Sequence, residues 1–138
     1  MMKCLVQGKI EMGLNLENKE GMKDYCKKIC EINGWILQKD KETLDDLLDG
    51  LVDNKNRYGY QSCPCRFTSG NRALDRDLIC PCDYAASDIE EFDTCYCNLY
   101  LNPDFYKKHK EKFIQILERR PIEKESAILE YIKKKPRK

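Results

Sequence analysis

Hydrophobic residues in the first half of the chain recur at the spacing of two amphipathic helices. Between residues 20 and 35 they fall on one face of a helix, at Met22, Tyr25, Cys26, Ile29 and Cys30. Gly34 follows this stretch as a typical helix stop. Between residues 40 and 55 the same template is filled by Leu44, Leu47, Leu48, Leu51 and Val52, and Asp40 is a candidate N-cap. The pattern therefore predicts two helices, each with one buried face.

A shorter helical signal lies in the middle of the chain. Ser87 and Glu90 have the spacing of a capping box, in which the two side chains satisfy the first backbone N–H groups of a helix. This spacing predicts a short helix over about residues 87–92.

The C-terminal third also carries helix signals. Asn102 is a suitable cap and Pro103 a suitable first-turn residue for a helix that we expect to run to residue 120. Pro121 would end this helix and open a last one over residues 122–132. Nowhere do apolar and polar residues alternate over a strand of useful length. We therefore expect an all-α fold, a small helical domain whose helices pack around cysteine-bearing loops.

Length, composition and charge narrow the class of protein. The 138 residues predict one domain, residues 1–138. Charged residues make up 36% and hydrophobic residues 41%, which is typical of a small globular protein. The net charge of +1 gives no strong overall field, so we expect no nucleic-acid partner. The chain shows neither an apolar run that would span a bilayer nor the apolar region of a signal peptide, which favours a cytoplasmic protein without membrane contact.

The nine cysteines change this picture. In a reducing compartment such a density indicates metal binding or redox catalysis rather than a disulfide framework. Three Cys-x-Cys pairs fall within residues 63–97, at Cys63/Cys65, Cys80/Cys82 and Cys95/Cys97. Thiolates are soft ligands that favour zinc, Cu(I) and iron–sulfur clusters.

Six thiols exceed the four that one tetrahedral or cubane site needs. The natural partition is four ligands and two thiols left over, and two thiols beside a redox metal can form a disulfide that exchanges electrons with it. The competing interpretation is a zinc or iron–sulfur module without catalysis, which organises an interaction surface. The spacing alone does not say which four residues would be ligands.

The cysteine motifs resemble those of a known family. The stretch "SCPCR", which contains Arg66, the second "CPC", and "CYCNLYLNPDF" together are similar to the motifs of the ferredoxin:thioredoxin reductase catalytic chain. The resemblance covers about residues 22–105, so residues 106–138 would form a C-terminal helical extension with a basic tail. It implies a ferredoxin-dependent disulfide reductase, an oxidoreductase in which an iron–sulfur cluster passes single electrons to an adjacent redox-active disulfide.

The resemblance also implies a role for each motif cysteine. A [4Fe-4S] cluster would be held by Cys63, Cys80, Cys82 and Cys95. The redox-active disulfide would join Cys65 to Cys97, with Cys65 as the exposed thiol that attacks the target. Tyr96 stands where the family has histidine, so we expect proton delivery to differ, because a tyrosine is a poor acid–base catalyst at pH 7.

The implied partners are ferredoxin as electron donor and a thioredoxin-like protein as substrate. A small variable subunit accompanies some members of the family. The basic tail, Lys133 to Lys138, is either a solvated end or a surface that attracts an acidic ferredoxin.

The remaining candidate residues favour structural roles. Cys26 and Cys30 fall on an apolar helix face, so we expect them in the core, and Cys4 has no partner in spacing. His109 is expected to pack in or at the edge of the core, and Trp35 to lie in the core or to shield the cluster. Arg66 is either a surface residue or, because it directly follows Cys65, a positive charge that lowers the pKa of that thiol.

Overall fold

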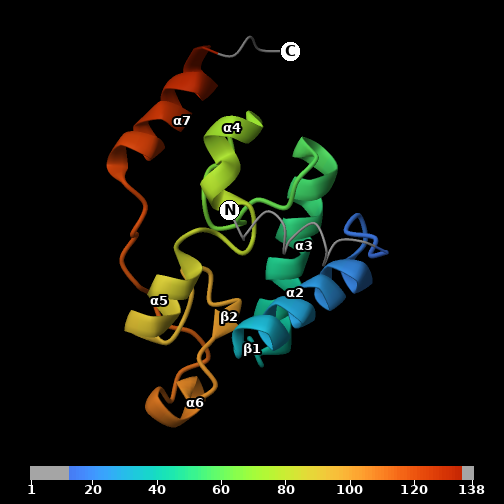
Figure 1. Cartoon of the computed structure of the whole chain (residues 1–138), viewed down its shortest axis with the longest axis vertical. Coiled ribbons are helices and arrows are strands. Elements are labelled where there is room, and N and C mark those ends of the chain that lie inside the picture. Colours follow the sequence, from blue (N-terminus) through green and yellow to red (C-terminus); the bar gives the residue numbers. More distant parts are fainter. Residues whose placement is uncertain (1–12, 135–138) are drawn as a thin grey trace.

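The computed structural model describes residues 13–134, and its first two helices lie side by side (Figure 1). Helix α2 spans Lys19–Asn33 and helix α3 spans Lys41–Tyr58. Both ends of α2 are capped, by Asn18, which accepts a hydrogen bond from the Gly21 N–H at 2.8 Å, and by Gly34 in the left-handed conformation with φ 73°. Asp40 caps α3 as predicted, accepting from the Thr43 N–H at 3.2 Å.

The predicted faces of these two helices form the main core. Every apolar residue expected to be buried on α2 is buried, and on α3 only Val52 remains half-exposed. Met22, Tyr25 and Leu48 are among the residues with no exposed surface. The two predicted helices and their packing are therefore confirmed, and burial of about ten apolar side chains supplies most of the stability of this part.

The chain is mostly helical, but a small sheet corrects the expectation of an all-α fold. Strand β1, Ile36–Leu37, pairs antiparallel with strand β2, Tyr100–Leu101, in the register Ile36↔Leu101 and Leu37↔Tyr100. Each strand has only two residues, too few for an alternating pattern to appear in the sequence. The pairing fastens the segment after the third cysteine pair to the end of α2.

Short elements link the cysteine pairs. Helix α4 spans Arg72–Asp75, the 3-10 turn η1 spans Arg76–Leu78, and helix α5 spans Ala85–Phe92. Because α5 begins two residues earlier than predicted, Ser87 lies inside the helix, and Tyr84 at the N-cap makes no side-chain capping bond. The short helix is confirmed, but the capping box that predicted it does not form.

The predicted helix over residues 103–120 is wrong. Only its first turn forms, as α6, Phe105–Lys108. The following C-terminal segment, residues 109–121, runs without regular structure from α6 back along the molecule to α7 at the opposite end (Figure 1). The Asn98 side-chain amide bonds both backbone groups of Ile114, at 2.8 Å and 2.9 Å. These contacts take the backbone groups that a helix would have paired internally, so tertiary contacts override the local helix preference.

The last helix begins after Pro121, as predicted. Helix α7 spans Ile122–Lys134 and lies beside α4. Its Ile128 has no exposed surface and packs with Cys63 and Leu78 in a second, smaller core. Cys4 and the tail residues 135–138 lie outside the described residues.

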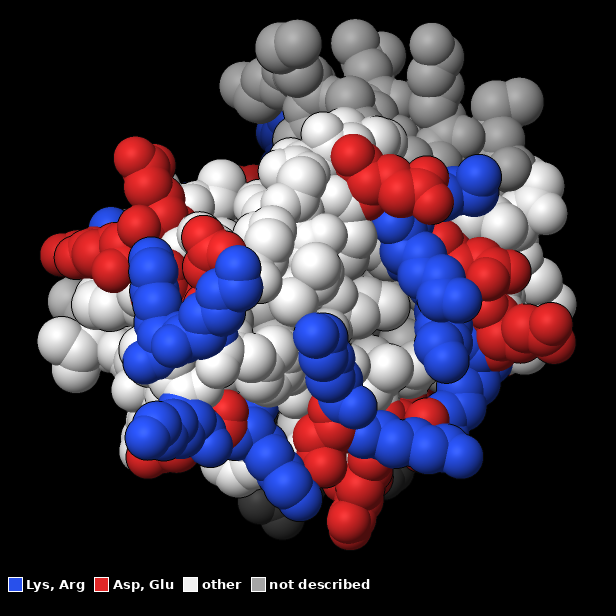
Figure 2. Space-filling model, turned by 90° about the horizontal axis from the view of Figure 1, so that it is seen from below, with Lys and Arg blue, Asp and Glu red and all other residues white. Residues whose placement is uncertain are grey.

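The described surface carries both signs of charge. Figure 2 shows Lys and Arg side chains interspersed with Asp and Glu on one face of the molecule, around an uncharged central area. Within residues 13–134, no helix combines the length and the apolar character needed to cross a bilayer.

Candidate functional site

The fold brings the three Cys-x-Cys pairs together. The first pair follows α3, the second follows η1 and the third follows α5. An antiparallel bridge between Ser62 and Ile79 aligns the first two pairs, through hydrogen bonds from the Cys63 N–H to the Leu78 carbonyl at 2.8 Å and from the Cys80 N–H to the Gln61 carbonyl at 2.9 Å. Pairs that lie far apart in the sequence are thus held at fixed positions by the backbone.

The first pair also packs against α3. Gly50 of α3 has no side chain, and a Cβ atom there would lie 2.7 Å from the Cβ of Pro64. A larger residue would force the two segments apart, because real Cβ atoms do not approach so closely. Glycine at this position therefore lets the first CPC turn lie directly on the helix.

Five of the six motif thiols surround one cavity. The cysteines on its wall are Cys63, Cys80, Cys82, Cys95 and Cys97. Apolar and aromatic side chains such as Ala85, Leu99 and Tyr100, together with the charged Arg66, complete the wall. Cys65 is not on this wall and is exposed. All four predicted ligands therefore face one space, with Cys97 beside them and Cys65 towards solvent.

Hydrogen bonds fix several of these sulfur atoms. The Cys63 and Cys97 Sγ atoms are 2.9 Å apart. The Tyr100 backbone N–H donates to Cys95 Sγ at 3.4 Å, and its hydroxyl lies 3.3 Å from Cys80 Sγ. Tyr25 of α2 donates its hydroxyl hydrogen to the Cys80 carbonyl at 2.6 Å. Sequence reasoning missed both tyrosines, since each appears in the chain only as one more apolar position.

The thiols on the cavity wall differ from Cys65 in acidity. Burial raises the pKa of Cys95 to about 12 and raises the pKa values of Cys80 and Cys82 as well. Hydrogen bonds from Cys63 and Cys97, with the positive charge of Arg66, lower the pKa of Cys65 to about 4. A lowered pKa favours the thiolate form of Cys65, which is the nucleophilic form.

The donor set fits an iron–sulfur cluster. Buried sulfurs with raised pKa values lose their protons when a metal takes the place of the proton, and four cysteine thiolates are the usual ligands of [2Fe–2S] and [4Fe–4S] clusters. Among residues 13–134, no group of three or more His, Cys, Asp or Glu side chains is placed to hold a single metal ion. A cubane is ligated at four separate corners, so its ligands need not converge on one point.

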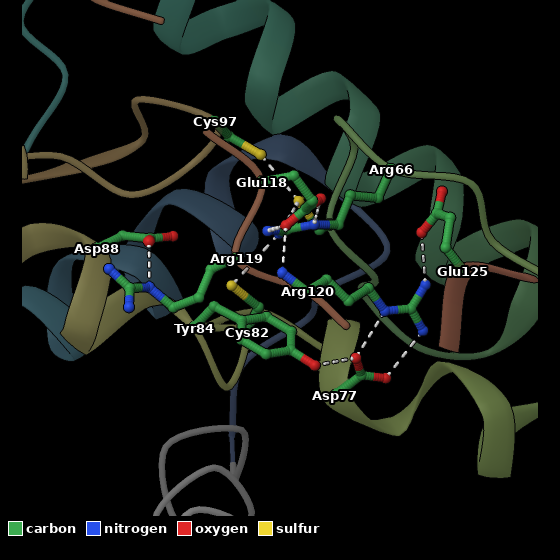
Figure 3. A network of polar contacts seen from close by, with 11 residues as sticks. Arg66, Asp77, Cys82, Tyr84, Asp88, Cys97, Glu118, Arg119, Arg120 and Glu125 are labelled. Atoms are coloured by element: carbon green, nitrogen blue, oxygen red, sulfur yellow. Dashed lines mark hydrogen bonds and ion pairs between the residues drawn. The ribbon is translucent and has the colours of Figure 1, made fainter. Parts of the chain in front are cut away.

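Arg66 lies between the thiols and the C-terminal segment (Figure 3). Its Nη1 atom is 3.4 Å from Cys63 Sγ and 3.5 Å from Cys82 Sγ. Its Nε and Nη2 atoms donate to the two carboxylate oxygens of Glu118, at 2.7 Å and 2.6 Å. The guanidinium also stacks on Tyr96, with 4.4 Å between its carbon and the ring centroid. Its positive charge contributes to the lowered pKa of Cys65, in the direction expected. Its pairing with Glu118 was not foreseen.

Glu118 is the first of three consecutive charged residues that join the C-terminal segment to the site. Arg119 Nε donates to Asp88 of α5 at 2.8 Å, and Arg120 donates to both oxygens of Asp77 at 2.7 Å and 3.1 Å. We call Glu118, Arg119 and Arg120 the clasp (Figure 3). No spacing in the sequence marks these residues as partners of the cysteine region.

A second, open groove reaches Cys97 from another direction. It has an empty volume of about 880 Å³ and is bordered by the start of α3 and by Lys112 and Phe113. Asp40, Glu42 and Asp46 line it, and Lys112 Nζ pairs with Asp40 at 3.3 Å. Cys97 is on the wall of both the groove and the thiol cavity.

The other residues singled out in the sequence have structural positions. Cys26 and Cys30 are buried in the main core, as expected. Trp35 is half-buried against the same core, with its ring 5.5 Å from that of Tyr100. His109 packs against Phe105, and its Nε2 atom lies 3.1 Å from Asp93 Oδ2.

Comparison with known proteins identifies the family. The family described as ferredoxin thioredoxin reductase catalytic beta chain matches residues 14–125, a longer stretch than the motifs suggested. The chain belongs to this family. It is therefore an oxidoreductase of the disulfide-reducing type.

Curated relatives share the family name at modest identity. The catalytic chain of ferredoxin-thioredoxin reductase from Porphyra purpurea is 28% identical over 90 residues, covering 64% of this chain and 73% of the relative. The chloroplastic catalytic chain from Spinacia oleracea is 27% identical over 108 residues, covering 77% of this chain and 72% of the relative. The chloroplastic chain from Arabidopsis thaliana is 29% identical over 87 residues, covering 62% of this chain and 57% of the relative.

Proposed function

We propose that this chain is a ferredoxin-dependent reductase of disulfides in thioredoxin-like proteins. The observation that carries the proposal is the arrangement of the six motif thiols. Four predicted ligands and Cys97 line one cavity, while Cys65 is exposed next to them. A purely structural metal site has no use for an exposed thiol of low pKa within hydrogen-bonding distance of a cavity thiol.

The cofactor of the proposal is a [4Fe-4S] cluster held by Cys63, Cys80, Cys82 and Cys95. When bound, it would supply single electrons next to a disulfide between Cys65 and Cys97. The surrounding apolar wall and the Tyr100 hydrogen bonds exclude water and orient the ligand sulfurs. The family name supports an iron–sulfur enzyme, and the four clustered cysteines provide the number of ligands that such a cluster needs.

The two remaining thiols perform the exchange with the target. Reduction of the Cys65–Cys97 disulfide by two electrons and two protons gives the dithiol. The Cys65 thiolate then attacks one sulfur of the target disulfide and forms a mixed disulfide, which releases the other target sulfur as a thiol. Cys97 attacks Cys65, restores the internal disulfide and releases the reduced target. The net reaction consumes two reduced ferredoxins and two protons for each target disulfide.

Tyr96 stands where the family has histidine, and we propose a different role for the tyrosine. Burial raises the pKa of Tyr96, so its hydroxyl keeps its proton at neutral pH. It thus acts as an aromatic partner of the Arg66 guanidinium rather than as an acid–base catalyst.

The energetics favour this direction of electron flow. A plant-type ferredoxin lies near −400 mV and thioredoxin near −270 mV. The difference of about 130 mV corresponds to roughly 6 kcal/mol for two electrons. Reduction of a thioredoxin-like target is therefore downhill.

The proposed partners are ferredoxin, a thioredoxin-like protein and, as in some relatives, a small second subunit. The groove next to Cys97 supports access by a protein target, because it opens to solvent beside the exchanging thiols. We also propose that the chain acts as one domain, since the clasp joins the C-terminal segment to the cysteine loops.

Substitution of the proposed nucleophile tests the function. Cys65→Ser should retain the iron–sulfur absorption of the protein but reduce a thioredoxin disulfide at least about 100-fold more slowly, because a hydroxyl does not replace the thiolate in exchange. The measurement is reduction of a thioredoxin by reduced ferredoxin under anaerobic conditions. The buried Cys30→Ser is the matched control and should reduce the disulfide at the normal rate. Wild-type turnover by Cys65→Ser would refute the assignment of the nucleophile.

A further inference from the structure

One buried tyrosine contacts two of the predicted cluster ligands. Tyr100 of β2 donates its backbone N–H to Cys95 Sγ at 3.4 Å, and its hydroxyl oxygen lies 3.3 Å from Cys80 Sγ. Only 1% of the residue is exposed. Because Cys80 precedes α5 and Cys95 follows it, Tyr100 connects the second cysteine pair with the third.

The backbone and the ring of Tyr100 are both held in place. Tyr100 pairs with Leu37 across the small sheet, and its carbonyl accepts a hydrogen bond from the Cys95 N–H at 3.0 Å. Its ring lies 5.5 Å from the ring of Trp35. The hydroxyl therefore has a fixed position at the wall of the thiol cavity, which Tyr100 helps to line.

The hydroxyl is the part of Tyr100 that the packing does not explain. A buried hydroxyl costs free energy unless it is hydrogen-bonded, and phenylalanine would fill the same space without that cost. The Tyr100 hydroxyl lies next to the sulfurs of Cys80 and Cys26. A cysteine that holds a metal is a thiolate, which only accepts hydrogen bonds, so the single hydroxyl hydrogen points to Cys80 when a cluster is bound. Cys26 is not a predicted ligand, and its S–H can donate to the hydroxyl oxygen.

We propose that Tyr100 is a positioning residue whose hydroxyl donates a hydrogen bond to the Cys80 thiolate, stabilises this ligand in its buried place and lowers its electron donation to iron. The inference rests on the proposed function. A thiolate in an apolar wall has lost its hydration, and a charge-assisted hydrogen bond offsets part of that cost. The same bond draws electron density away from the sulfur, which is one way in which a protein tunes an iron–sulfur cluster.

Tyr100→Phe removes only the hydroxyl and keeps the ring and the backbone bond to Cys95. Wild type and variant are purified with their clusters under anaerobic conditions, and the loss of iron to an excess of a ferrous-iron chelator is followed by absorbance. We expect about tenfold faster iron loss from the variant, because removal of a group that hydrogen-bonds a metal ligand typically lowers metal affinity about 10- to 100-fold.

The visible spectrum of the same samples separates tuning from packing. Without the hydrogen bond the Cys80 sulfur donates electrons more readily, so we expect the sulfur-to-iron charge-transfer absorption of Tyr100→Phe to move to longer wavelength. A hydroxyl that only filled space would leave this absorption unchanged. Faster iron loss without a change in absorption would therefore overturn the proposal.

Tyr25→Phe is the matched control. Tyr25 is also fully buried, and its hydroxyl bonds the same cysteine, but at the Cys80 carbonyl and not at the sulfur. We expect this variant to lose iron at a rate close to that of wild type and to keep the wild-type absorption. Equal effects of the two substitutions would show a general loosening of the core and would refute the role of the Tyr100 hydroxyl.

The remaining outcomes separate the inference from the proposed function. Iron loss from Tyr100→Phe at the wild-type rate, or more slowly, refutes the inference alone. If Tyr100→Phe does not fold, Tyr100→3-fluorotyrosine decides, because the fluorine makes the hydroxyl a stronger donor. We then expect slower iron loss and absorption at shorter wavelength, and no change contradicts the inference. If wild-type protein purified without oxygen contains no iron and sulfide, the proposed function fails, and the inference fails with it.

Discussion

The two sides of the site are held in place by different kinds of interaction. On one side, α2 and α3 contribute apolar faces that form the main core beneath the cavity. On the other, the C-terminal segment contributes the clasp, whose three charged side chains reach Arg66, Asp88 and Asp77. The apolar side stabilises by burial that many residues share, whereas the clasp depends on a few individual ion pairs.

The clasp works because its three consecutive side chains reach different parts of the site. Glu118 and Arg120 reach the first cysteine turn and η1, while Arg119 between them reaches α5. Residues 113–119 form neither helix nor strand, and the chain bends at Arg120. The helix that we predicted here would separate Glu118 and Arg120 by about 200° around its axis.

Loss of a predicted cluster ligand should have the largest effect, because it should affect both the apolar side and the clasp side of the site. Cys80→Ser removes a thiolate that the cavity requires, so we expect purified protein to lack the full iron and sulfide content and the visible absorption of wild type. The measurement is iron and acid-labile sulfide analysis after anaerobic purification. Cys26→Ala, a substitution of a cysteine in the main core, is the control and should keep the cluster. Retention of full iron content by Cys80→Ser would remove Cys80 from the ligand set.

The second-largest effect should come from truncating a buried side chain on the apolar side, which should lower the global stability of the protein. Leu48 has no exposed surface, and Leu48→Ala should cost about 2–5 kcal/mol of unfolding free energy through lost burial and the remaining cavity. Equilibrium unfolding in urea, followed by far-UV circular dichroism, gives this value. The half-exposed Val52→Ala on the same helix should cost less, and equal costs would contradict the burial argument.

A substitution in the clasp should have a smaller and more local effect. Asp77→Asn weakens the bond to buried Arg120, but Glu125 still pairs with that arginine, so we expect a cost of about 2 kcal/mol. Limited proteolysis should cut within residues 109–121 before α2 and α3 unfold. Glu91→Gln removes an exposed partner of Arg119 and should cost less than about 1 kcal/mol.

Lowering the pH gives a second test of the ion pair between Asp77 and Arg120. Arg120 and Tyr84 donate hydrogen bonds that outweigh burial and lower the pKa of Asp77 below its usual value. A carboxyl with a lowered folded-state pKa contributes stability above its unfolded pKa of about 3.9, and this contribution is lost as pH falls through the folded value. The stability difference between wild type and Asp77→Asn should therefore shrink below about pH 4. A difference that stays constant down to pH 2 would show that the charge of Asp77 is unimportant.

The sequence predicted the apolar side well and the clasp not at all. Helices α2 and α3 were predictable because apolar periodicity and the caps at Asp40 and Gly34 are local signals. The six thiols were visible by spacing, and the family resemblance divided them into ligands and exchanging residues. The contact of Glu118 with Arg66 was not predictable, because the two residues lie 52 positions apart in the sequence. A single charged residue also makes no periodic pattern that would mark it. The preference of residues 109–120 for a helix was real, but the contacts of Asn98 and the clasp outweighed it.

The hydrogen bonds of Asn98 with Ile114 fix the path of the chain and also the starting point of the stretch that leads to Glu118. Between this anchor and Glu118 there are only residues 115–117, so the length of this stretch is set at both ends. An inserted residue would lengthen this stretch and displace Glu118 from Arg66. Before the anchor, exposed Lys110 and Glu111 face no such constraint. Protein engineers who want to graft a label or an affinity tag into this enzyme should therefore choose positions 110–111 and leave the length of 115–117 unchanged.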